Sequence, residues 1–232
     1  MTVIAGLDTA TDDVSVAVVR DGDVADERLV PKPADDRPRH AEALLVELEG
    51  VVGTAGGWEA VDVLAVGIGP GSFTGLRVGI ATARAIAQAL GKEIVPINTH
   101  AALARGIGES AESERSLLPV IDARRGQVFA ALATPPGRER WGPLVATPQE
   151  LAERVAELPQ SPLAAGSGAL RFRGELEAAG AEVLPDSSPA HRVWARHVCR
   201  LAADGTPSPP EAIQPIYLRP PDAQVWLDRD SP

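Results

Sequence analysis

The sequence predicts an α/β protein made of two lobes with related plans, the second one abbreviated. Short apolar runs of strand length alternate with longer stretches in which apolar residues recur at helical spacing. The order of these segments in the first half returns, in reduced form, in the second. A stretch of low hydrophobicity over residues 106–115 marks the expected boundary. We therefore expect one lobe over residues 1–106, a second over residues 107–204, and a proline-rich tail over residues 205–232.

The expected strands of the first lobe are apolar runs bounded by turn residues. They cover Val3–Leu7, Val14–Val19, Val24–Leu29, Val61–Ile68 and Glu93–Ile97. The dipeptide Asp21-Gly22 between the second and third runs is typical of a tight hairpin turn. The run Val61–Ile68 is apolar throughout, which indicates a strand buried on both faces.

Amphipathic segments predict the helices of the first lobe. From Arg39 to Val52, apolar residues recur at helical spacing. A longer helix should run from Thr74 to Leu90 and end at Gly91, and a short third helix should begin at Thr99.

The second half repeats this order with fewer residues. Thr147-Pro148-Gln149-Glu150 has the pattern of a capping box with proline at the first helical position, so a helix should begin there. The other expected segments are strands at Leu117–Ile121, Gln127–Leu132, Pro162–Ala165 and Glu182–Leu184, and helices at Arg171–Ala179 and Ala190–Ala203.

Composition limits the kinds of function that this chain can have. Its 232 residues carry a formal net charge of −10, and both halves are acidic, which argues against a nucleic-acid-binding protein that acts alone. The single cysteine, Cys199, excludes an internal disulfide and any multi-cysteine metal site. We find no secretory signal and no apolar stretch long enough to span a membrane, so we expect a soluble, cytosolic protein.

The most informative motif is the glycine-rich segment from Gly69 to Gly79, which reads GPGSFTGLRVG. Glycines between a buried strand and a helix allow a sharp turn and expose backbone N–H groups to an anion. The segment lacks both the lysine of a Walker-type phosphate loop and the spacing of a dinucleotide-binding loop. Two interpretations stay open, namely tight packing of a strand on a helix, and contact with a phosphate or a partner.

Two acidic turns are candidate ligand sites. Asp8 and Thr11 follow the first strand, and Asp122 follows the first strand of the second half, so these residues could hold a magnesium–phosphate group across a cleft. The alternative is that Asp and Thr satisfy the backbone of their own turns. Gly166 and Gly168 could admit an adenosine against the backbone, although a simple loop explains them as well.

Hydrolase motifs are missing from the sequence. The four histidines, His40, His100, His191 and His197, include no pair at the i, i+4 spacing of a zinc site on one helix face. Cys199 lies among helix-forming residues, so we expect it to be a small buried apolar side chain and not a nucleophile. We therefore expect no zinc hydrolase, and the sequence shows no catalytic constellation.

The long helix carries small residues on two of its faces. Gly75, Gly79, Ala83 and Ala87 form one row, and Ala81, Ala85 and Ala89 form a second row about 200° around the helix. A helix that packs only on its own sheet needs one apolar face. Either this helix is enclosed within its own lobe, or one row contacts a partner chain. The candidate interface residues are Leu44, Leu48, Gly75, Gly79, Ala81, Ala83, Ala85 and Ala89.

Three segments together resemble the TsaB (YeaZ) family. They are Asp8-Thr-Ala-Thr11, the motif at residues 69–79, and Pro215-Ile-Tyr-Leu-Arg219 near the end, and the resemblance spans nearly the whole chain. It implies a two-lobed fold of the actin/sugar-kinase/Hsp70 (ASKHA) superfamily. It also implies the dimerisation subunit of the bacterial machinery that places threonylcarbamoyl on N6 of the adenosine beside the anticodon, at tRNA position 37.

The resemblance further implies the partners and the division of labour. A catalytic paralogue, TsaD, would pair with this chain, and a small ATPase, TsaE, would join them. TsaD holds a metal with a His-x-x-x-His pair, whereas the corresponding segment here has only His100, with alanine at position 104. We therefore expect a non-catalytic scaffold without a cofactor of its own, with ATP or ADP possible at the level of the complex.

The same resemblance bears on oligomeric state. Alone, the chain should form a homodimer that TsaD can replace, and it should meet tRNA only through the complex. The alternative function is a small nucleotide-dependent kinase or ATPase that uses the cleft between the lobes.

Overall fold

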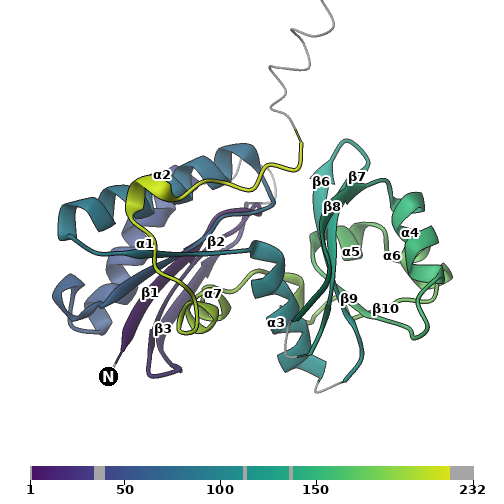
Figure 1. The fold of residues 1–232 in the computed structure, drawn as a ribbon, viewed down its shortest axis with the longest axis horizontal. Coiled ribbons are helices and arrows are strands. Elements are labelled where there is room, and N and C mark those ends of the chain that lie inside the picture. Colours follow the sequence, from purple (N-terminus) through teal and green to yellow (C-terminus); the bar gives the residue numbers. More distant parts are fainter. Residues whose placement is uncertain (1, 34–39, 112–113, 136–137, 220–232) are drawn as a thin grey trace, which may run out of the picture.

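The computed structural model of the chain describes residues 2–33, 40–111, 114–135 and 138–219. These residues form two lobes side by side, each built on a mixed five-stranded sheet (Figure 1). The expected two-lobed α/β class is therefore confirmed. Among the described residues, no helix combines the length and the apolar character needed to span a bilayer.

The first sheet has the order β3-β2-β1-β4-β5. The strands are β1 (Val3–Asp8), β2 (Val14–Arg20), β3 (Asp23–Val30), β4 (Val63–Gly67) and β5 (Ile94–Ile97). The first three are antiparallel neighbours, whereas β4 and β5 run parallel to β1. Strand β1 is buried along its whole length, as expected for a central strand covered on both faces.

The second sheet repeats this arrangement in the order β10-β9-β6-β7-β8. Its strands are β6 (Leu117–Arg124), β7 (Gln127–Thr134), β8 (Arg138–Ala146), β9 (Leu163–Ala165) and β10 (Glu182–Val183). Again, three antiparallel strands are followed by two parallel ones. The predicted duplication is therefore confirmed, and the second sheet has one strand, β8, more than the four expected from the sequence.

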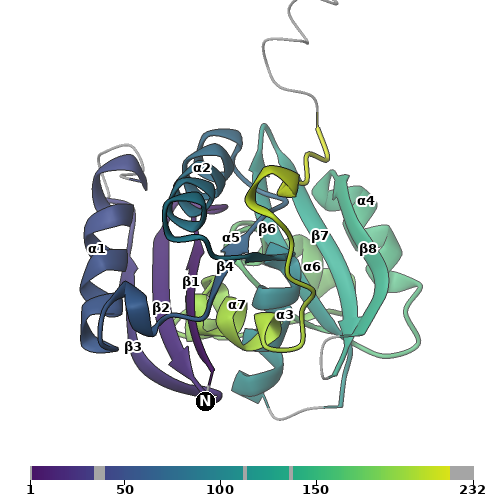
Figure 2. The same cartoon turned by 60° about the vertical axis from the view of Figure 1, so that its left-hand side comes forward.

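Helices cover the sheets in a layered order (Figures 1 and 2). Helices α1 (His40–Thr54) and α2 (Phe73–Leu90) share one apolar core with the outer face of the first sheet. Helix α3 (Thr99–Ala111) and helix α7 (Ala195–Ala202) lie between the sheets. The outer face of the second sheet is covered by α4 (Pro148–Ala156), α5 (Ser167–Arg171) and α6 (Arg173–Ala178).

Short 3-10 helices connect several of these elements. They are η1 (Trp58–Ala60), η2 (Pro189–His191) and η3 (Pro210–Ala212). The capping box predicted for α4 is present, since Glu150 N donates to Thr147 Oγ1 over 3.2 Å and Thr147 N donates to Glu150 Oε2 over 2.7 Å.

Several boundaries differ from those expected. Strand β8 was missed, because Gly142 and Pro143 interrupt its pattern, as is typical of an edge strand. Phe172 divides the expected helix Arg171–Ala179 into α5 and α6, and the last helix is the shorter α7.

The lobes also do not follow the expected linear division. Helix α7, which was expected in the second lobe, packs on β1 and β2 of the first sheet. The expected boundary stretch, residues 106–115, begins within helix α3, which contacts both β6 and α7. The chain therefore returns to the first lobe before its C-terminal segment begins.

Candidate functional site

A cleft of about 1190 Å³ lies between the two lobes. The loop after β1 and the beginning of α2 form its first-lobe wall, and the β6–β7 turn forms the opposite wall. The segment before α7 and residues 216–219 complete it. Of the described residues that line this cleft, six are Lys or Arg and four are Asp. The cleft is therefore a locally basic part of an acidic protein.

The glycine-rich motif at residues 69–79 serves close packing in this structure. A Cβ atom on Gly71 would lie 2.2 Å from Ala10 O, and one on Gly75 would lie 2.0 Å from Thr9 O. Thr9 Oγ1 in turn donates a hydrogen bond of 2.7 Å to Gly75 O. The glycines therefore let α2 press directly against the loop that follows β1, which is the packing interpretation left open by the sequence.

The beginning of α2 nevertheless faces the cleft. Ser72 caps the helix, with Gly75 N donating to Ser72 Oγ over 3.4 Å. Ser72, Phe73 and Thr74 all line the cleft. The same motif thus provides both the packing of α2 and part of the cleft wall.

Asp8, a predicted ligand residue, is buried and is not among the described residues that line the cleft. Its carboxylate accepts hydrogen bonds from Ala10 N over 2.8 Å and from Thr99 Oγ1 over 2.9 Å. Burial raises the pKa of Asp8 to about 6, against the lowering effect of these two hydrogen bonds. Asp8 therefore joins β1 to the beginning of α3.

Asp122 does line the cleft, but ion pairs already compensate its charge. Arg171 Nη1 lies 2.8 Å and Arg124 Nη1 lies 3.7 Å from Asp122 Oδ2. The carboxylates of Asp8 and Asp122, which by their positions in the sequence could hold a magnesium–phosphate group between them, therefore do not share the cleft. Thr11 lines it, although its carbonyl oxygen lies 2.8 Å from His40 Nε2.

Gly166 and Gly168 pack against strand β6. Gly166 has φ 119°, and a Cβ atom there would lie 2.1 Å from Val120 O. A Cβ atom on Gly168 would lie 2.8 Å from Val120 Cγ1. Ser167 between them lines the cleft and accepts a hydrogen bond of 3.1 Å from Asp122 N. The geometry thus favours the loop interpretation of this segment.

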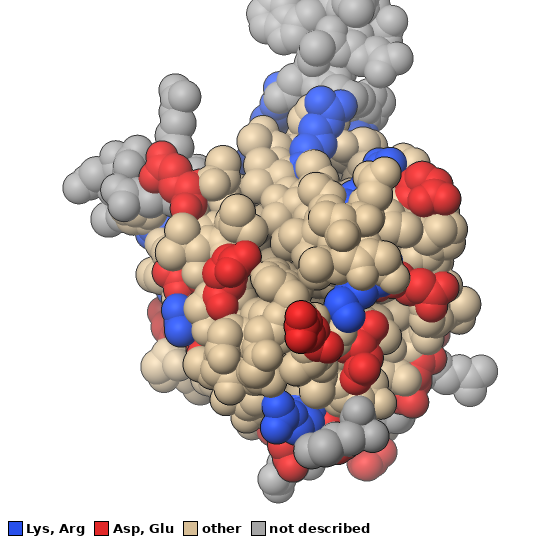
Figure 3. Space-filling view, turned by 90° about the vertical axis from the view of Figure 1, so that its left-hand side faces the viewer, with Lys and Arg blue, Asp and Glu red and all other residues tan. Residues whose placement is uncertain are grey.

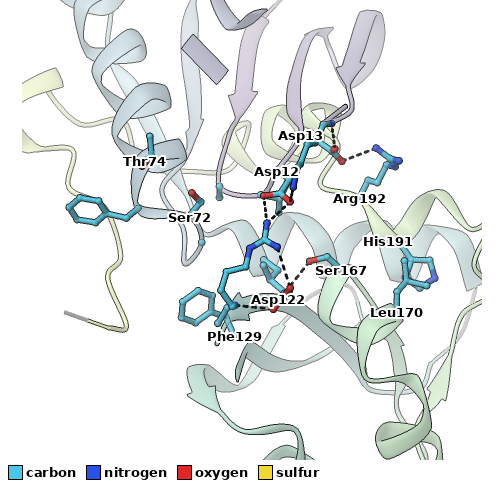
Figure 4. Close-up of a pocket in the computed structure, with 18 of the residues that line it drawn as sticks. Asp12, Asp13, Ser72, Thr74, Asp122, Phe129, Ser167, Leu170, His191 and Arg192 are labelled. Carbon is cyan, nitrogen blue, oxygen red and sulfur yellow. Dashed lines mark hydrogen bonds and ion pairs between the residues drawn. The ribbon is translucent and has the colours of Figure 1, made fainter. Parts of the chain in front are cut away.

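Ion pairs join the lobes across the cleft (Figure 4). Arg124 Nη2, at the end of β6, donates to Asp12 Oδ1 over 2.6 Å, and this carboxylate raises the pKa of Arg124. Lys32 Nζ lies 3.6 Å from the same carboxylate. On the other side, Arg192 Nη1 lies 2.9 Å from Asp13 Oδ2. The cleft is thus bridged by charged groups of the protein itself.

Sequence reasoning missed this cluster of ion pairs. Asp12 and Asp13 directly follow the motif that ends at Thr11, and Arg124 lies in a turn between two expected strands. Their positions beside a motif and in a turn were the only indication in the sequence that these charged residues could belong to a site. This indication was incomplete, because no pattern within one segment indicates which distant residue a charged side chain will meet.

The histidines and Cys199 are the remaining candidates for metal ligands or catalytic groups. Among the described residues, no group of three or more His, Cys, Asp or Glu side chains could hold a metal ion. His100 is buried, and burial lowers its pKa to about 4. Cys199 is also buried, and burial raises the pKa of its thiol.

The two rows of small residues on α2 have different surroundings. Ala81, Ala85 and Ala89 are exposed, whereas the row containing Gly75, Gly79 and Ala83 faces the lobe's own core. Five of the predicted interface residues are therefore buried inside the lobe and unavailable to a partner. These five are Leu44, Leu48, Gly75, Gly79 and Ala83.

Two five-stranded sheets of the same plan around a cleft form an ASKHA-type fold. A hexokinase of the ROK class from Thermus thermophilus shares this fold with a TM-score of 0.51, at 16% identity over 88% of this chain and 100% of that chain. Residues 29–156 match the family model described as "TsaD: tRNA N6-adenosine threonylcarbamoyltransferase".

Similarity over the full length is more specific. The tRNA threonylcarbamoyladenosine biosynthesis protein TsaB of Escherichia coli is 30% identical, over 93% of this chain and 94% of its own. The structure of YeaZ from Pseudomonas aeruginosa matches with a TM-score of 0.78 at 26% identity, over 94% of this chain and 100% of that chain. The chain belongs to the TsaB (YeaZ) family.

Proposed function

We propose that this chain is a non-catalytic scaffold subunit of a complex that makes threonylcarbamoyladenosine in tRNA. The observation that carries this proposal is its similarity, along nearly the whole chain, to a protein named for that biosynthesis. Its partner would be a catalytic paralogue of the TsaD type, which transfers threonylcarbamoyl from its adenylate to N6 of the adenosine at position 37. A TsaE-type ATPase would complete the assembly.

The outer helices of the first lobe offer a surface for this partner. Leu45 and Val46 on α1 are 49% and 66% exposed, and Leu90 at the end of α2 is 41% exposed. The row Ala81, Ala85 and Ala89 is exposed on α2, which packs beside α1. Figure 3 looks onto the first-lobe side, where much of the surface is uncharged. Exposed apolar side chains gathered in this way favour an interaction surface.

Small residues on this surface suit contact between helices. Alanine side chains allow two helix backbones to approach closely, so a partner with its own pair of related helices could form a four-helix contact. Residues 29–156, which include α1 and α2, match the TsaD family model, so a TsaD-type partner would carry a related pair. On this basis the free chain forms a homodimer through the same surface, and TsaD replaces one copy.

The proposal assigns catalysis to the partner because of the residues around His100. The second position of a His-x-x-x-His pair is occupied here by Ala104, and His100 itself is 2% exposed in the packed region between the lobes. A side chain so enclosed cannot reach a substrate. ATP or ADP would act only at the level of the complex.

The test is binding to the organism's own TsaD, followed by a modification assay with TsaE and tRNA. The variant Ala85→Arg puts a long charged side chain into the proposed contact, and Ala156→Arg on α4 puts the same side chain on an exposed position of the second lobe as a control. We expect Ala85→Arg to lose self-association, TsaD binding and modification, and Ala156→Arg to keep all three. Wild-type binding by Ala85→Arg would place the interface elsewhere.

The same preparations distinguish the alternative function. Tight binding of ATP by the isolated chain, with phosphoryl transfer or hydrolysis that is independent of TsaD, would favour a kinase or ATPase that uses the cleft. The scaffold proposal predicts that modification requires both chains, and that the isolated chain turns over no nucleotide.

A further inference from the structure

The segment from Gly205 to Arg219, here called the C-terminal strap, crosses from the first lobe to the second (Figure 1). It begins beside the first sheet, where Ser208 and Ile94 exchange backbone hydrogen bonds of 2.8 and 3.1 Å. Ile213 enters the core of the first lobe and is 2% exposed. The strap is therefore fixed to the first lobe along most of its length.

The Pro215–Arg219 motif holds the next contacts with the first lobe. Ile216 N donates to Ile68 O over 2.8 Å, directly before the glycine-rich motif. The ring of Tyr217 lies 5.1 Å from the ring of Phe73 at the beginning of α2. The guanidinium group of Arg77 lies 3.9 Å above the Phe73 ring, and its Nε lies 3.4 Å from Tyr217 Oη. An aromatic and cationic cluster thus anchors the strap to α2.

Two residues later, the strap is bonded to the other lobe. Arg219 Nη1 donates to Ala123 O over 3.1 Å, and Arg219 Nη2 donates to Gln127 Oε1. Ala123 lies on β6 and Gln127 on β7, so both acceptors belong to the second sheet. Leu218, between the two anchors, packs against the apolar cluster that both lobes share. The change of lobe is complete within the motif.

We propose that the C-terminal strap clamps the two lobes together, and that Arg219 is the positioning residue that fastens it to the second lobe. Helices α3 and α7 join the lobes at one end of the gap between the sheets, and the strap crosses at the other end (Figure 1). Residues 216–219 also line the cleft, so the clamp fixes one of its walls. The role of the motif is then to set the angle between the lobes, independently of the proposed scaffold function.

A planar guanidinium group suits this task. Arg219 reaches a backbone carbonyl on one strand and a side-chain amide on the next, which requires two donors in a fixed geometry. A lysine side chain has a single charged nitrogen, so it would bind one of the two acceptors less firmly than arginine does. The pair Arg124–Asp12 is a second tie across the cleft, so the test must include a background in which that pair is weakened.

The experiment measures both the attachment of the strap and the angle between the lobes. The attachment is followed by hydrogen exchange of the Ile216 amide, which is bonded to Ile68 O. The angle is followed by pulsed spin-label distances between Glu42→Cys on α1 and Glu153→Cys on α4, two exposed positions in different lobes. The native Cys199 is buried and stays unlabelled.

Arg219→Ala is compared with Arg173→Ala, which removes an arginine whose bonds stay within the second lobe. Both changes are made in the wild-type and Asp12→Asn backgrounds. We expect Arg219→Ala to speed exchange at Ile216 about tenfold and to broaden or shift the distance distribution, most strongly with Asp12→Asn. Arg173→Ala should leave the distribution unchanged.

The milder variant Gln127→Ala removes one acceptor of Arg219 and should change the distance distribution in the same direction by a smaller amount. A distance distribution that stays as in the wild type for Arg219→Ala in both backgrounds would overturn the proposal, whatever happens to exchange at Ile216. In that case the strap covers the first lobe without clamping the second.

Discussion

Thr99 donates a hydrogen bond of 2.9 Å to the buried carboxylate of Asp8, although 91 positions separate the two residues. Thr99 Oγ1 also accepts a hydrogen bond of 3.1 Å from Gly69 N. One hydroxyl group thus joins the end of β1, the loop before α2 and the beginning of α3. The buried carboxylate of Asp8 thus has a structural role in linking these elements.

The raised pKa of Asp8 predicts a specific dependence of stability on pH. Burial raises its pKa from 3.8 to about 6, so the folded state binds a proton that the unfolded state has already lost in this range. The contribution of Asp8 to the free energy of unfolding is therefore most favourable below pH 3.8, and it is lost as the pH rises through 6. Asp8→Asn removes this titration.

The measurement compares the free energy of unfolding of wild type and Asp8→Asn by urea denaturation at several pH values. The wild type should lose about 2 kcal/mol relative to the variant between pH 4 and pH 7. A difference between the two proteins that stays constant over this range would contradict the prediction.

His100 should make the protein sensitive to acid. Burial lowers its pKa to about 4, and among the described residues its ring nitrogens have no well-formed hydrogen bond. The folded state therefore resists a proton that the unfolded state accepts below about pH 6.5, and stability falls as the pH drops from there towards 4. His100→Leu should keep its stability at pH 7 and lose less of it at pH 4.5 than the wild type.

His191→Leu is the matched control for that experiment. His191 Nδ1 accepts a hydrogen bond of 3.1 Å from Gly166 N, so its removal leaves a buried donor without a partner. This variant should be destabilised by about 1–3 kcal/mol at neutral pH as well. Equal losses for both variants at pH 7 would show that His100 is bonded in the same way.

Cys199 should be unreactive in the folded protein. The thiol is buried against the backbone of Gly6, where a Cβ atom would lie 2.4 Å from its Sγ, and burial raises its pKa. Only the thiolate reacts readily with disulfide reagents, so labelling at pH 8 should proceed in denaturant and be negligible without it. One equivalent of fast labelling under native conditions would contradict this.

The two rows on α2 should respond differently to the same substitution. Ala83 is fully buried, so Ala83→Arg forces a charge into the core and should cost several kcal/mol or prevent folding. Ala85 is exposed, and Ala85→Arg should change the free energy of unfolding by no more than about 0.5 kcal/mol. Thermal unfolding of both variants tests this prediction. A stable Ala83→Arg variant would show that the row containing Ala83 is not enclosed in the core.

Local patterns of residues predict the repeated α/β plan and the position of the glycine-rich motif. Hydrophobic periodicity and capping residues act within one segment, so strands such as Val3–Asp8 and the helix Phe73–Leu90 were predicted nearly to their ends. The edge strand β8 was missed because a strand at an edge tolerates the glycine and proline that interrupt its pattern.

Which distant groups come into contact depends on the packing of the two lobes. Periodicity set the angle between the two rows on α2, but the row with Ala83 is buried because the sheet lies on that side. Asp12 and Arg124 are 112 positions apart, and Arg219 finds its acceptors on β6 and β7. Contacts of this kind depend on how the chain passes between the lobes, and no local pattern of residues encodes that path.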